Sequence, residues 1–162
     1  MSNPLPDYLL PVTVPASWGW RGIIAMRNRR YDLGRGVHRA DLPVISVGNL
    51  TTGGTGKTPM VRWIAERLRD DGMKPAVLLR GYGSADPDSS DEARLYRREL
   101  EGMPVIADPD RVGALRSHLA SGSDATCAIL DDGFQHRRLH RDLDLVLIDA
   151  TRPLDSLRLL PA

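Results

Sequence analysis

From residue 43 onward, short apolar runs alternate along the chain with segments whose apolar positions recur at helical spacing. Apolar residues on consecutive positions are typical of strands that are covered on both faces. Strands that alternate with helices form a parallel sheet with helices packed against it. The pattern therefore predicts an α/β fold whose five strands lie at residues 44–47, 76–79, 104–107, 125–130 and 143–148.

Three helices are predicted between these strands, at residues 59–71, 91–100 and 110–120. In the first helix, apolar residues recur on one face, Pro59 suits the first turn, and Gly72 follows the end as a cap. The polar residues 81–90 are predicted to form a mobile loop, on the side of the sheet where the loop after the first strand also lies.

Residues 1–42 differ from the rest of the chain. They are rich in proline and arginine and hold two of the three tryptophans, and they lack the alternation of strands and helices. We therefore expect two parts: an N-terminal amphipathic and basic segment at residues 1–42, and a compact α/β domain at residues 43–162.

Composition narrows the classes of protein that fit. The 162 residues are 41% apolar and 27% charged, which is ordinary for one compact domain. A net charge of +1 gives no reason to expect a nucleic-acid partner. Cys127 is the only cysteine, so an internal disulfide is impossible, and its apolar neighbours favour a buried side chain. Since no segment has the roughly 20 apolar residues of a membrane span or the pattern of a signal peptide, we predict a cytosolic location or attachment to a membrane face in the cytosol.

The residues between the first strand and the first helix end as a phosphate-binding loop does. The stretch GGTGKT at 53–58 matches the core of the pattern G-x-x-x-x-G-K-[ST], although Thr51 stands where that pattern has glycine. A loop that leads into a helix N-terminus presents several backbone N–H groups to an anion. Lys57 would reach the β- and γ-phosphates, and the Thr58 hydroxyl would complete a Mg²⁺ shell. We therefore predict a P-loop NTPase-like fold with a site for ATP and Mg²⁺ at Gly53, Gly54, Thr55, Gly56, Lys57 and Thr58; a glycine-rich turn without a ligand is the alternative.

A phosphoryl-transfer site also needs an acidic residue that holds the metal, normally at the end of a neighbouring strand. Two apolar runs lead into such residues: one ends in Asp131 and Asp132, and the other in Asp149. We favour the first pair, because it leads directly into Gly133 and a polar loop that can face a substrate. That the pair only begins a turn is the alternative. Asp149 is interpreted as a strand-end cap or as a group behind the metal ligands.

The polar loop after this pair carries histidines and arginines. His136 and His140 are four residues apart, a spacing that occurs in metal sites, but no third ligand lies nearby and the neighbouring arginines disfavour a cation. We interpret those arginines, at positions 137, 138 and 141, as contacts for a phosphate or a phosphorylated sugar.

Four ordered motifs resemble the tetraacyldisaccharide 4'-kinase family of lipid A biosynthesis. They are VISVGNLTTGGTGKTP at 44–59, LLRGYGS at 78–84, the Asp-Glu pair at 91–92, and ILDDGFQHRRLHRDLDLVLIDA at 129–150. The likeness covers about residues 17–162 and includes RNRRYDLG at 27–34; a threonine at the position of Thr51 is usual in the family. Its members transfer the γ-phosphate of ATP to the 4'-hydroxyl of a tetraacylated glucosamine disaccharide 1-phosphate, which is the activity that the resemblance implies.

The resemblance also implies roles for single residues. Lys57 and Thr58 would bind ATP and Mg²⁺, Asp131 would be a metal ligand, and Asp132 would act with Lys57 as a catalytic residue. In isolation, Asp91 is a charge that favours the dipole of the helix it opens. The resemblance makes it the general base for the sugar hydroxyl, because a carboxylate within hydrogen-bond reach can accept that proton.

The chain departs from the family in two respects. The family usually has glycine before and proline after the Asp-Glu pair, where this chain has Ser90 and Ala93. Family members are also considerably longer, with a second domain that supplies a histidine partner for the catalytic aspartate. We therefore interpret the chain as a fragment without that domain, which binds nucleotide and catalyses poorly.

A lipid substrate must be met at the surface of a membrane. The N-terminal segment supplies aromatic and apolar anchors followed by cations for anionic headgroups, namely Trp18, Trp20, Ile23, Ile24, Met26, Arg27, Arg29 and Arg30. A helix packed on the protein's own core fits the pattern equally well. The resemblance favours peripheral contact with the cytoplasmic face of the inner membrane.

Two other functions fit the same phosphate loop. One is a P-loop ATPase of the partition or metallochaperone type, but such proteins usually carry another lysine early in the loop, where this chain has Asn-Leu-Thr at 49–51. The other is a nucleotide-binding module without catalysis.

Overall fold

The computed structural model describes residues 24–49, 56–81 and 90–149. The chain forms two compact units, one of residues 1–36 with 153–162 and one of residues 37–152. The described part of the first unit is a helix at residues 24–32, which is followed by Gly34 in the left-handed conformation with a φ of 71°. The second unit holds the sheet. The domain boundary at residue 42 stays a prediction.

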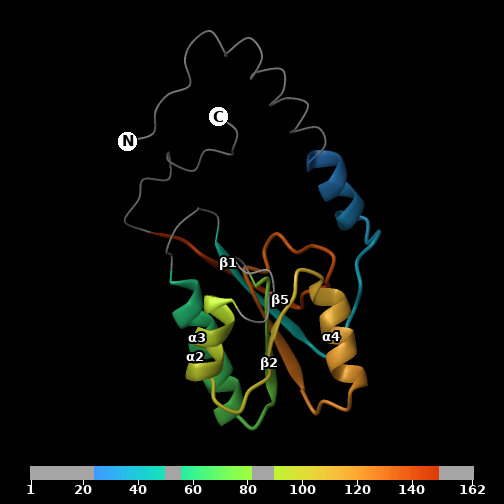
Figure 1. The fold of residues 1–162 in the computed structure, drawn as a ribbon. Coiled ribbons are helices and arrows are strands. Elements are labelled where there is room, and N and C mark those ends of the chain that lie inside the picture. The colour runs from blue at the N-terminus through green and yellow to red at the C-terminus, as the bar shows by residue number, and fades with distance from the viewer. Residues whose placement is uncertain (1–23, 50–55, 82–89, 150–162) are drawn as a thin grey trace. The chain divides into compact units, whose positions relative to one another are not determined.

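The sheet consists of five parallel strands, as the alternating pattern predicts (Figure 1). The order across the sheet is β3-β2-β4-β1-β5, so the first strand of the chain lies between the last two. Each predicted apolar run became a strand, with shifts of one to two residues at the ends: β1 (Val44–Asn49), β2 (Pro75–Leu79), β3 (Val105–Ala107), β4 (Cys127–Asp131) and β5 (Leu143–Leu147).

The three predicted helices are α2 (Lys57–Asp70), α3 (Asp91–Glu99) and α4 (Arg111–Ala120). Helix α2 begins two residues before Pro59, which lies in its first turn, where a missing N–H costs nothing. Gly72 ends it with a φ of 81° and donates its N–H to the Arg69 carbonyl, while Met73 donates to Leu68, the two bonds of a Schellman motif. The side chain of Ser90 caps α3 by accepting a hydrogen bond from the Ala93 N–H.

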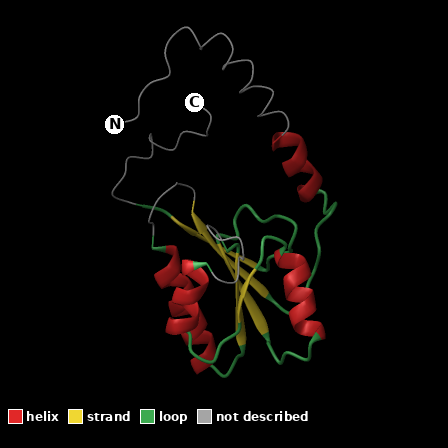
Figure 2. Cartoon of the chain, viewed as in Figure 1, coloured by secondary structure: helices red, strands yellow, loops and turns green. Residues whose placement is uncertain are grey.

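The helices cover both faces of the sheet, α2 and α3 on one and α4 on the other (Figure 2). Alternate residues of a strand point to opposite faces, and two separate apolar cores result. In β2, Val77 and Leu79 pack with Val61 of α2 and Tyr96 of α3, whereas Leu78 packs with residues of α4. The sheet is therefore the middle layer of three.

Strand β5 departs from the prediction that every strand is covered on both faces. Its residues are exposed or half-buried, and the apolar Leu143, Val146 and, just after the strand, Ile148 are 49%, 38% and 61% exposed. The physical reason is position: β5 is the outermost strand next to β1, and while Leu145 and Leu147 pack against the core on the side of α2 and α3, the opposite face of the strand is exposed. An apolar run alone does not reveal what covers it.

Candidate active site

The carboxyl ends of β1 and β4 lie side by side at one edge of the sheet. The two strands are parallel neighbours, and Val47 of β1 is paired with Asp131 of β4. Chain segments that leave these two strands therefore start next to each other, at the point where the strand order reverses and where open α/β sheets bind ligands. Of the predicted phosphate loop, residues 50–55 with Gly53, Gly54 and Thr55 lie outside the described residues.

The end of that loop is described and has the expected form. Gly56 precedes α2 with a φ of 79°, a left-handed conformation that glycine adopts without steric cost. Lys57, the first residue of α2, donates a hydrogen bond to Asn49 Oδ1 at the end of β1, over 3.0 Å. Its ammonium group also lies 3.3 Å from Asp132 Oδ1. Lys57, at the described end of the predicted phosphate loop, thus lies beside Asp132, while the roles of the two residues stay a prediction.

The ion pair of Lys57 with Asp132 is open to solvent, since the two side chains are 25% and 42% exposed. Exposed pairs contribute little net free energy because water screens them and two side chains lose rotamer freedom. Lys57 is therefore held near the site without being locked to Asp132. The lysine can turn to another anion at small cost.

The turn after β4 is pressed tightly against β1. Asp132 has a φ of 50°, a left-handed conformation that aspartate tolerates better than most residues. A Cβ on Gly133 would lie 2.6 Å from the Leu130 Cβ and 2.7 Å from the Ser46 Oγ. A Cβ on Gly48 would lie 2.6 Å from the Phe134 Cβ. Two absent side chains thus allow the turn to bring Asp132 to Lys57.

Asp131 differs from its neighbour in being almost fully buried, with 2% of its surface exposed. The Tyr96 hydroxyl donates a hydrogen bond to its Oδ2 over 2.7 Å. Burial raises the pKa of Asp131, and the bond from Tyr96 opposes that rise because it stabilises the carboxylate. Its other oxygen, Oδ1, is buried without a hydrogen-bond partner among the described residues. A buried carboxylate oxygen that lacks a donor is a group suited to a cation.

The residues present fit a Mg²⁺ ion that is bound together with a nucleotide. Within residues 24–49, 56–81 and 90–149, no three histidine, cysteine or acidic side chains form a ready-made metal cage. Mg²⁺ does not need one: it usually keeps several waters and binds one or two carboxylates plus substrate phosphates. Asp131 and the Thr58 hydroxyl, which hydrogen-bonds to Tyr96, offer oxygen ligands of the right kind.

Helix α3 places the Asp-Glu pair at the same edge. Asp91 is exposed, whereas Glu92 is half-buried. Burial raises the pKa of Glu92, and the charges of Asp131 and then Asp132 raise it further, while Arg111 and Lys57 lower it. Glu92 therefore lies within the electrostatic field of the site. It is more buried than Asp91 because adjacent residues of a helix point about 100° apart. The sequence predicts Asp91 as the general base and assigns no separate role to Glu92.

The loop after Asp132 carries a half-buried histidine, His136, which lies within the electrostatic influence of several arginines. Arg111, at the start of α4 and 3% exposed, donates to the Asp132 carbonyl over 3.3 Å. Burial lowers the pKa of His136 to about 4, with Arg111, Arg138 and Arg141 acting in the same direction. His136 is therefore neutral at pH 7. Arg141 is fixed by bonds to the carbonyls of Gly133 and Phe134.

Three residues of this site were missed by the sequence reasoning: Tyr96, Arg111 and Asn49. Tyr96 had no distinguishing signal, because a tyrosine on the apolar face of a short helix is usually a core residue. Arg111 follows the predicted helix start and reads as an exposed charge. Asn49 lies inside the motif at residues 44–59, whose pattern alone assigns no role to an asparagine at that position.

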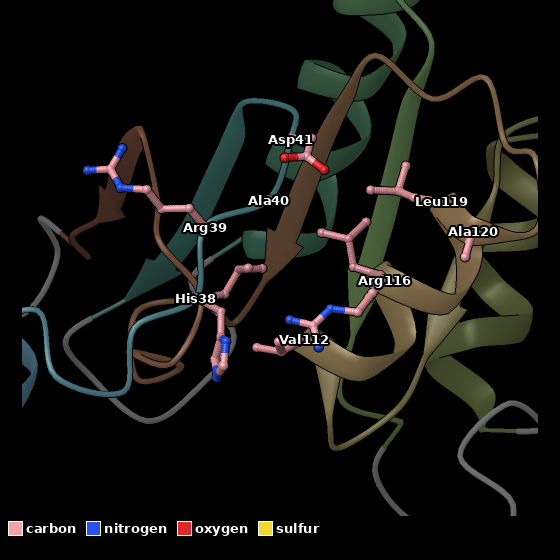
Figure 3. Close-up of a pocket in the computed structure, with 10 residues that line it drawn as sticks. His38, Arg39, Ala40, Asp41, Val112, Arg116, Leu119 and Ala120 are labelled. Atoms are coloured by element: carbon pink, nitrogen blue, oxygen red, sulfur yellow. The ribbon is translucent and has the colours of Figure 1, made fainter.

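Two cavities of the described structure lie away from this edge. One of about 340 Å³ is bordered by residues 38–41, Leu139 and one side of α4, where Figure 3 shows Val112 and Arg116 of the helix near His38. The other, of 360 Å³, follows residues 39–44 with His140 and Asp142. Neither includes Lys57, Asp131 or Asp132, so the chemistry of the side chains, and not the size of a cavity, identifies the candidate site.

The comparisons with known proteins agree with this geometry. The family described as LpxK, tetraacyldisaccharide-1-P 4'-kinase, matches residues 9–162. A tetraacyldisaccharide 4'-kinase of Pseudomonas fluorescens (strain Pf0-1) is 42% identical, with 91% of this chain and 48% of that protein covered. One of Ectopseudomonas mendocina (strain ymp) is 41% identical with the same coverage.

A solved structure is similar as well. It is the crystal structure of LpxK from Aquifex aeolicus in complex with ATP, with a TM-score of 0.79, 35% identity, and coverage of 94% of this chain and 52% of that one. The chain spans about half the length of the curated relatives it matches. No helix within the described residues is long and apolar enough to cross a membrane. The resemblance of the four motifs is confirmed, and the chain belongs to the tetraacyldisaccharide-1-P 4'-kinase family.

Proposed function

We propose that the chain is the nucleotide-binding part of a kinase that transfers the γ-phosphoryl group of ATP to the 4'-hydroxyl of a tetraacylated glucosamine disaccharide 1-phosphate, a step of lipid A biosynthesis. One observation carries this proposal: Lys57, at the end of the phosphate loop, lies 3.3 Å from Asp132 at the end of β4. The family and the relatives' names supply the identity of the acceptor.

The predicted nucleotide ligands take these roles. Lys57 leaves its weak pair with Asp132 and binds the β- and γ-phosphates, while the backbone at residues 53–56 encloses them. Thr58 and Asp131 hold Mg²⁺, which when bound neutralises charge on the phosphates. Asp132, released from Lys57, stays at the mouth of the site as a catalytic acid-base or orienting group.

The acceptor hydroxyl is assigned to Asp91. This carboxylate is exposed at the N-terminus of α3, so an incoming sugar can reach it, and a positioned carboxylate can orient the hydroxyl and accept its proton. Glu92, whose pKa is raised by burial and by the charges of Asp131 and Asp132, is the more buried of the two. Arg138, in an exposed pair with Asp110 over 3.6 Å, can turn to an anionic acceptor such as a phosphorylated sugar, whereas Arg141 is held by Asp144.

The decisive experiment is transfer of radiolabel from [γ-³²P]ATP to the acylated disaccharide 1-phosphate in detergent micelles. Labelled lipid supports the kinase. Release of ADP and phosphate without labelled lipid supports the partition or metallochaperone type of ATPase. Binding of ATP without either product supports a nucleotide-binding module.

Two substitutions separate the nucleotide from the acceptor side. Lys57→Ala is expected to reduce ATP affinity by at least tenfold, because the phosphates lose a charge-assisted contact. Asp91→Ala is expected to spare ATP binding and to abolish lipid phosphorylation. Lys74→Ala removes a lysine that pairs with Asp124 on the far surface and is the matched control. Equal loss of ATP affinity in the Lys57 and Asp91 variants would show that Asp91 is misassigned.

We further propose that the protein acts at the cytoplasmic face of the inner membrane without spanning it, with no nucleic-acid partner. Of the predicted anchors, Trp18, Trp20 and Ile23 lie outside the described residues; in the helix at 24–32, Met26 is 74% exposed. Co-sedimentation with liposomes that contain anionic lipid tests this. Serine at Trp18, Trp20 and Ile24 is expected to abolish binding, and unchanged binding would exclude the segment as an anchor.

A further inference from the structure

Tyr96 connects three elements of the site through one hydroxyl group. It lies in the middle of α3, its side chain is completely buried, and it packs in the core between α2, α3 and β2. Its hydroxyl donates to Asp131 Oδ2 of β4 over 2.7 Å. The same hydroxyl has a side-chain hydrogen bond with Thr58 in the first turn of α2.

The direction of these two bonds follows from chemistry. A carboxylate only accepts, so the single proton of the Tyr96 hydroxyl points to Asp131. Tyr96 must then accept from Thr58, because its single proton is already used. The protons therefore run from Thr58 to Tyr96 and from Tyr96 to Asp131.

This order fixes where the oxygen lone pairs point. With its proton directed at Tyr96, the Thr58 oxygen presents its lone pairs elsewhere. With Oδ2 occupied by Tyr96, Asp131 presents Oδ1, which is buried and has no hydrogen-bond partner among the described residues. A divalent cation binds through such lone pairs, and its ligands are commonly oriented by groups behind them.

We propose that Tyr96 is a positioning residue that aims the lone pairs of Thr58 and of Asp131 Oδ1 at a divalent cation bound with the nucleotide. The inference rests on the proposed function, since it assumes that ATP and Mg²⁺ bind at this edge. Tyr96 itself touches neither the nucleotide nor the metal. Its two hydrogen bonds hold the side chains of Thr58 and Asp131 in one arrangement before the cation binds.

The test is the binding of fluorescent ATP by the Tyr96→Phe variant during titration with free Mg²⁺. Phenylalanine keeps the ring in the core and removes only the hydroxyl. The Mg²⁺ concentration for half-maximal enhancement of ATP binding is expected to rise about tenfold, the effect typical of a lost group behind a metal ligand. ATP affinity in excess chelator is expected to stay within about twofold of the parent, because the phosphate contacts remain.

Ser123→Ala is the matched control. It also deletes a hydroxyl with a hydrogen bond, to His118, but in the loop that leads into the opposite end of β4. Its Mg²⁺ midpoint is expected to equal that of the parent chain. If Tyr96→Phe has the parent's midpoint as well, Tyr96 is only a core residue and the inference is wrong. If the parent chain binds no ATP with or without Mg²⁺, the proposed function fails instead.

A double-mutant cycle separates positioning from loosened packing. Because part of its effect passes through Thr58, Tyr96→Phe should raise the midpoint less in a Thr58→Val background than in the parent chain, and the remaining rise reports the path through Asp131. An equal rise in both backgrounds would show that Tyr96 does not act through Thr58 and would overturn the inference. Should Tyr96→Phe not fold, 3,5-difluorotyrosine at position 96 keeps the core, weakens the acceptor for Thr58 and strengthens the donor to Asp131. The midpoint should therefore shift, and an unchanged value would contradict the inference.

Discussion

Strands β4 and β5 flank β1 on its two sides and look alike in sequence. Both are five residues long, both are mainly apolar, and both lead into aspartates. In β4 all five residues are buried under helices on both faces, whereas β5 has no buried residue and is the outer strand. The comparison shows that Asp131 is buried because helices cover both faces of its strand, β4. The strand's own composition does not provide this burial.

The largest expected effect is on stability and contrasts the two strands directly. Ile129→Ala in β4 should lower the free energy of unfolding by about 3 kcal/mol, because a fully buried side chain leaves a cavity. Val146→Ala in β5 removes a side chain that is 38% exposed and should cost about 0.5 kcal/mol. Urea unfolding followed by circular dichroism measures both. Similar losses at the two positions would mean that β5 is covered in solution.

Next is a test of which aspartate serves the reaction. Asp131→Asn should reduce lipid phosphorylation roughly 100-fold, about 2.7 kcal/mol, through loss of the charge that we propose holds Mg²⁺. It should leave the protein equally or more stable, since burial raises the pKa of Asp131 and the neutral amide avoids that cost. Asp149→Asn, after β5, should change the rate less than threefold. A rate for Asp149→Asn as low as that for Asp131→Asn would reassign the metal ligand.

The turn that ends β4 gives the third prediction. Gly133→Ala should destabilise the fold by about 2 kcal/mol and weaken ATP binding, because its methyl group must displace Ser46 or Leu130 and with them Asp132. Gly122→Ala, in open space before β4 but with a φ of 87°, should cost about 1 kcal/mol and leave ATP binding intact. Urea unfolding and fluorescent ATP binding distinguish the two. Unimpaired binding in Gly133→Ala would show that the turn does not position Asp132.

The smallest expected effect concerns the loop between the two strands. The pKa of His136 is lowered to about 4 in the fold from an ordinary value of 6.5. Between these values His136 binds a proton in the unfolded chain and stays neutral in the folded one. Its contribution to stability is therefore fully present above pH 6.5 and is lost as the pH falls toward 4. Compared with His136→Asn, the parent chain should lose on the order of 1 kcal/mol more between pH 7 and pH 4.5.

Urea unfolding at several pH values measures this difference. His118→Asn, which removes the histidine bonded to Ser123, controls for the loss of a ring. Parallel pH profiles for the parent chain and His136→Asn would contradict a half-buried His136 that stays neutral in the fold.

The strands, the end of α2 and the position of the site at the edge of the sheet were predictable from the sequence. They depend on local patterns and on the rule that parallel strands end at a common edge of the sheet. The apolar runs fixed the strands to within two residues, and Gly72 marked the end of α2. Since parallel strands end at a common edge, the acids after β4 could be expected near Lys57 once β1 and β4 were neighbours. The family motifs pointed to the same arrangement.

The rest depends on contacts between distant positions, which a single sequence does not display. The hydroxyl of Tyr96 meets a carboxylate 35 positions away, and no periodicity reports such a bond. Whether Asp91 or Glu92 turns inward depends on how α3 is rotated on the sheet. The exposure of β5 depends on which elements pack beside it, because Leu143 and Val146 have the same apolar character as the buried residues of β4.

Cys127 opens β4, the strand whose other end carries Asp131 and Asp132. It is the only thiol of the chain and is buried, and burial raises its pKa. A thiol reagent can therefore modify it only in molecules whose central strand has separated from its neighbours, so the rate of modification measures how often the middle of the sheet opens. A ligand that binds the closed form must slow that chemistry by mass action. The rate at which Cys127 is modified therefore reports ligand binding from the opposite end of β4, without an engineered label.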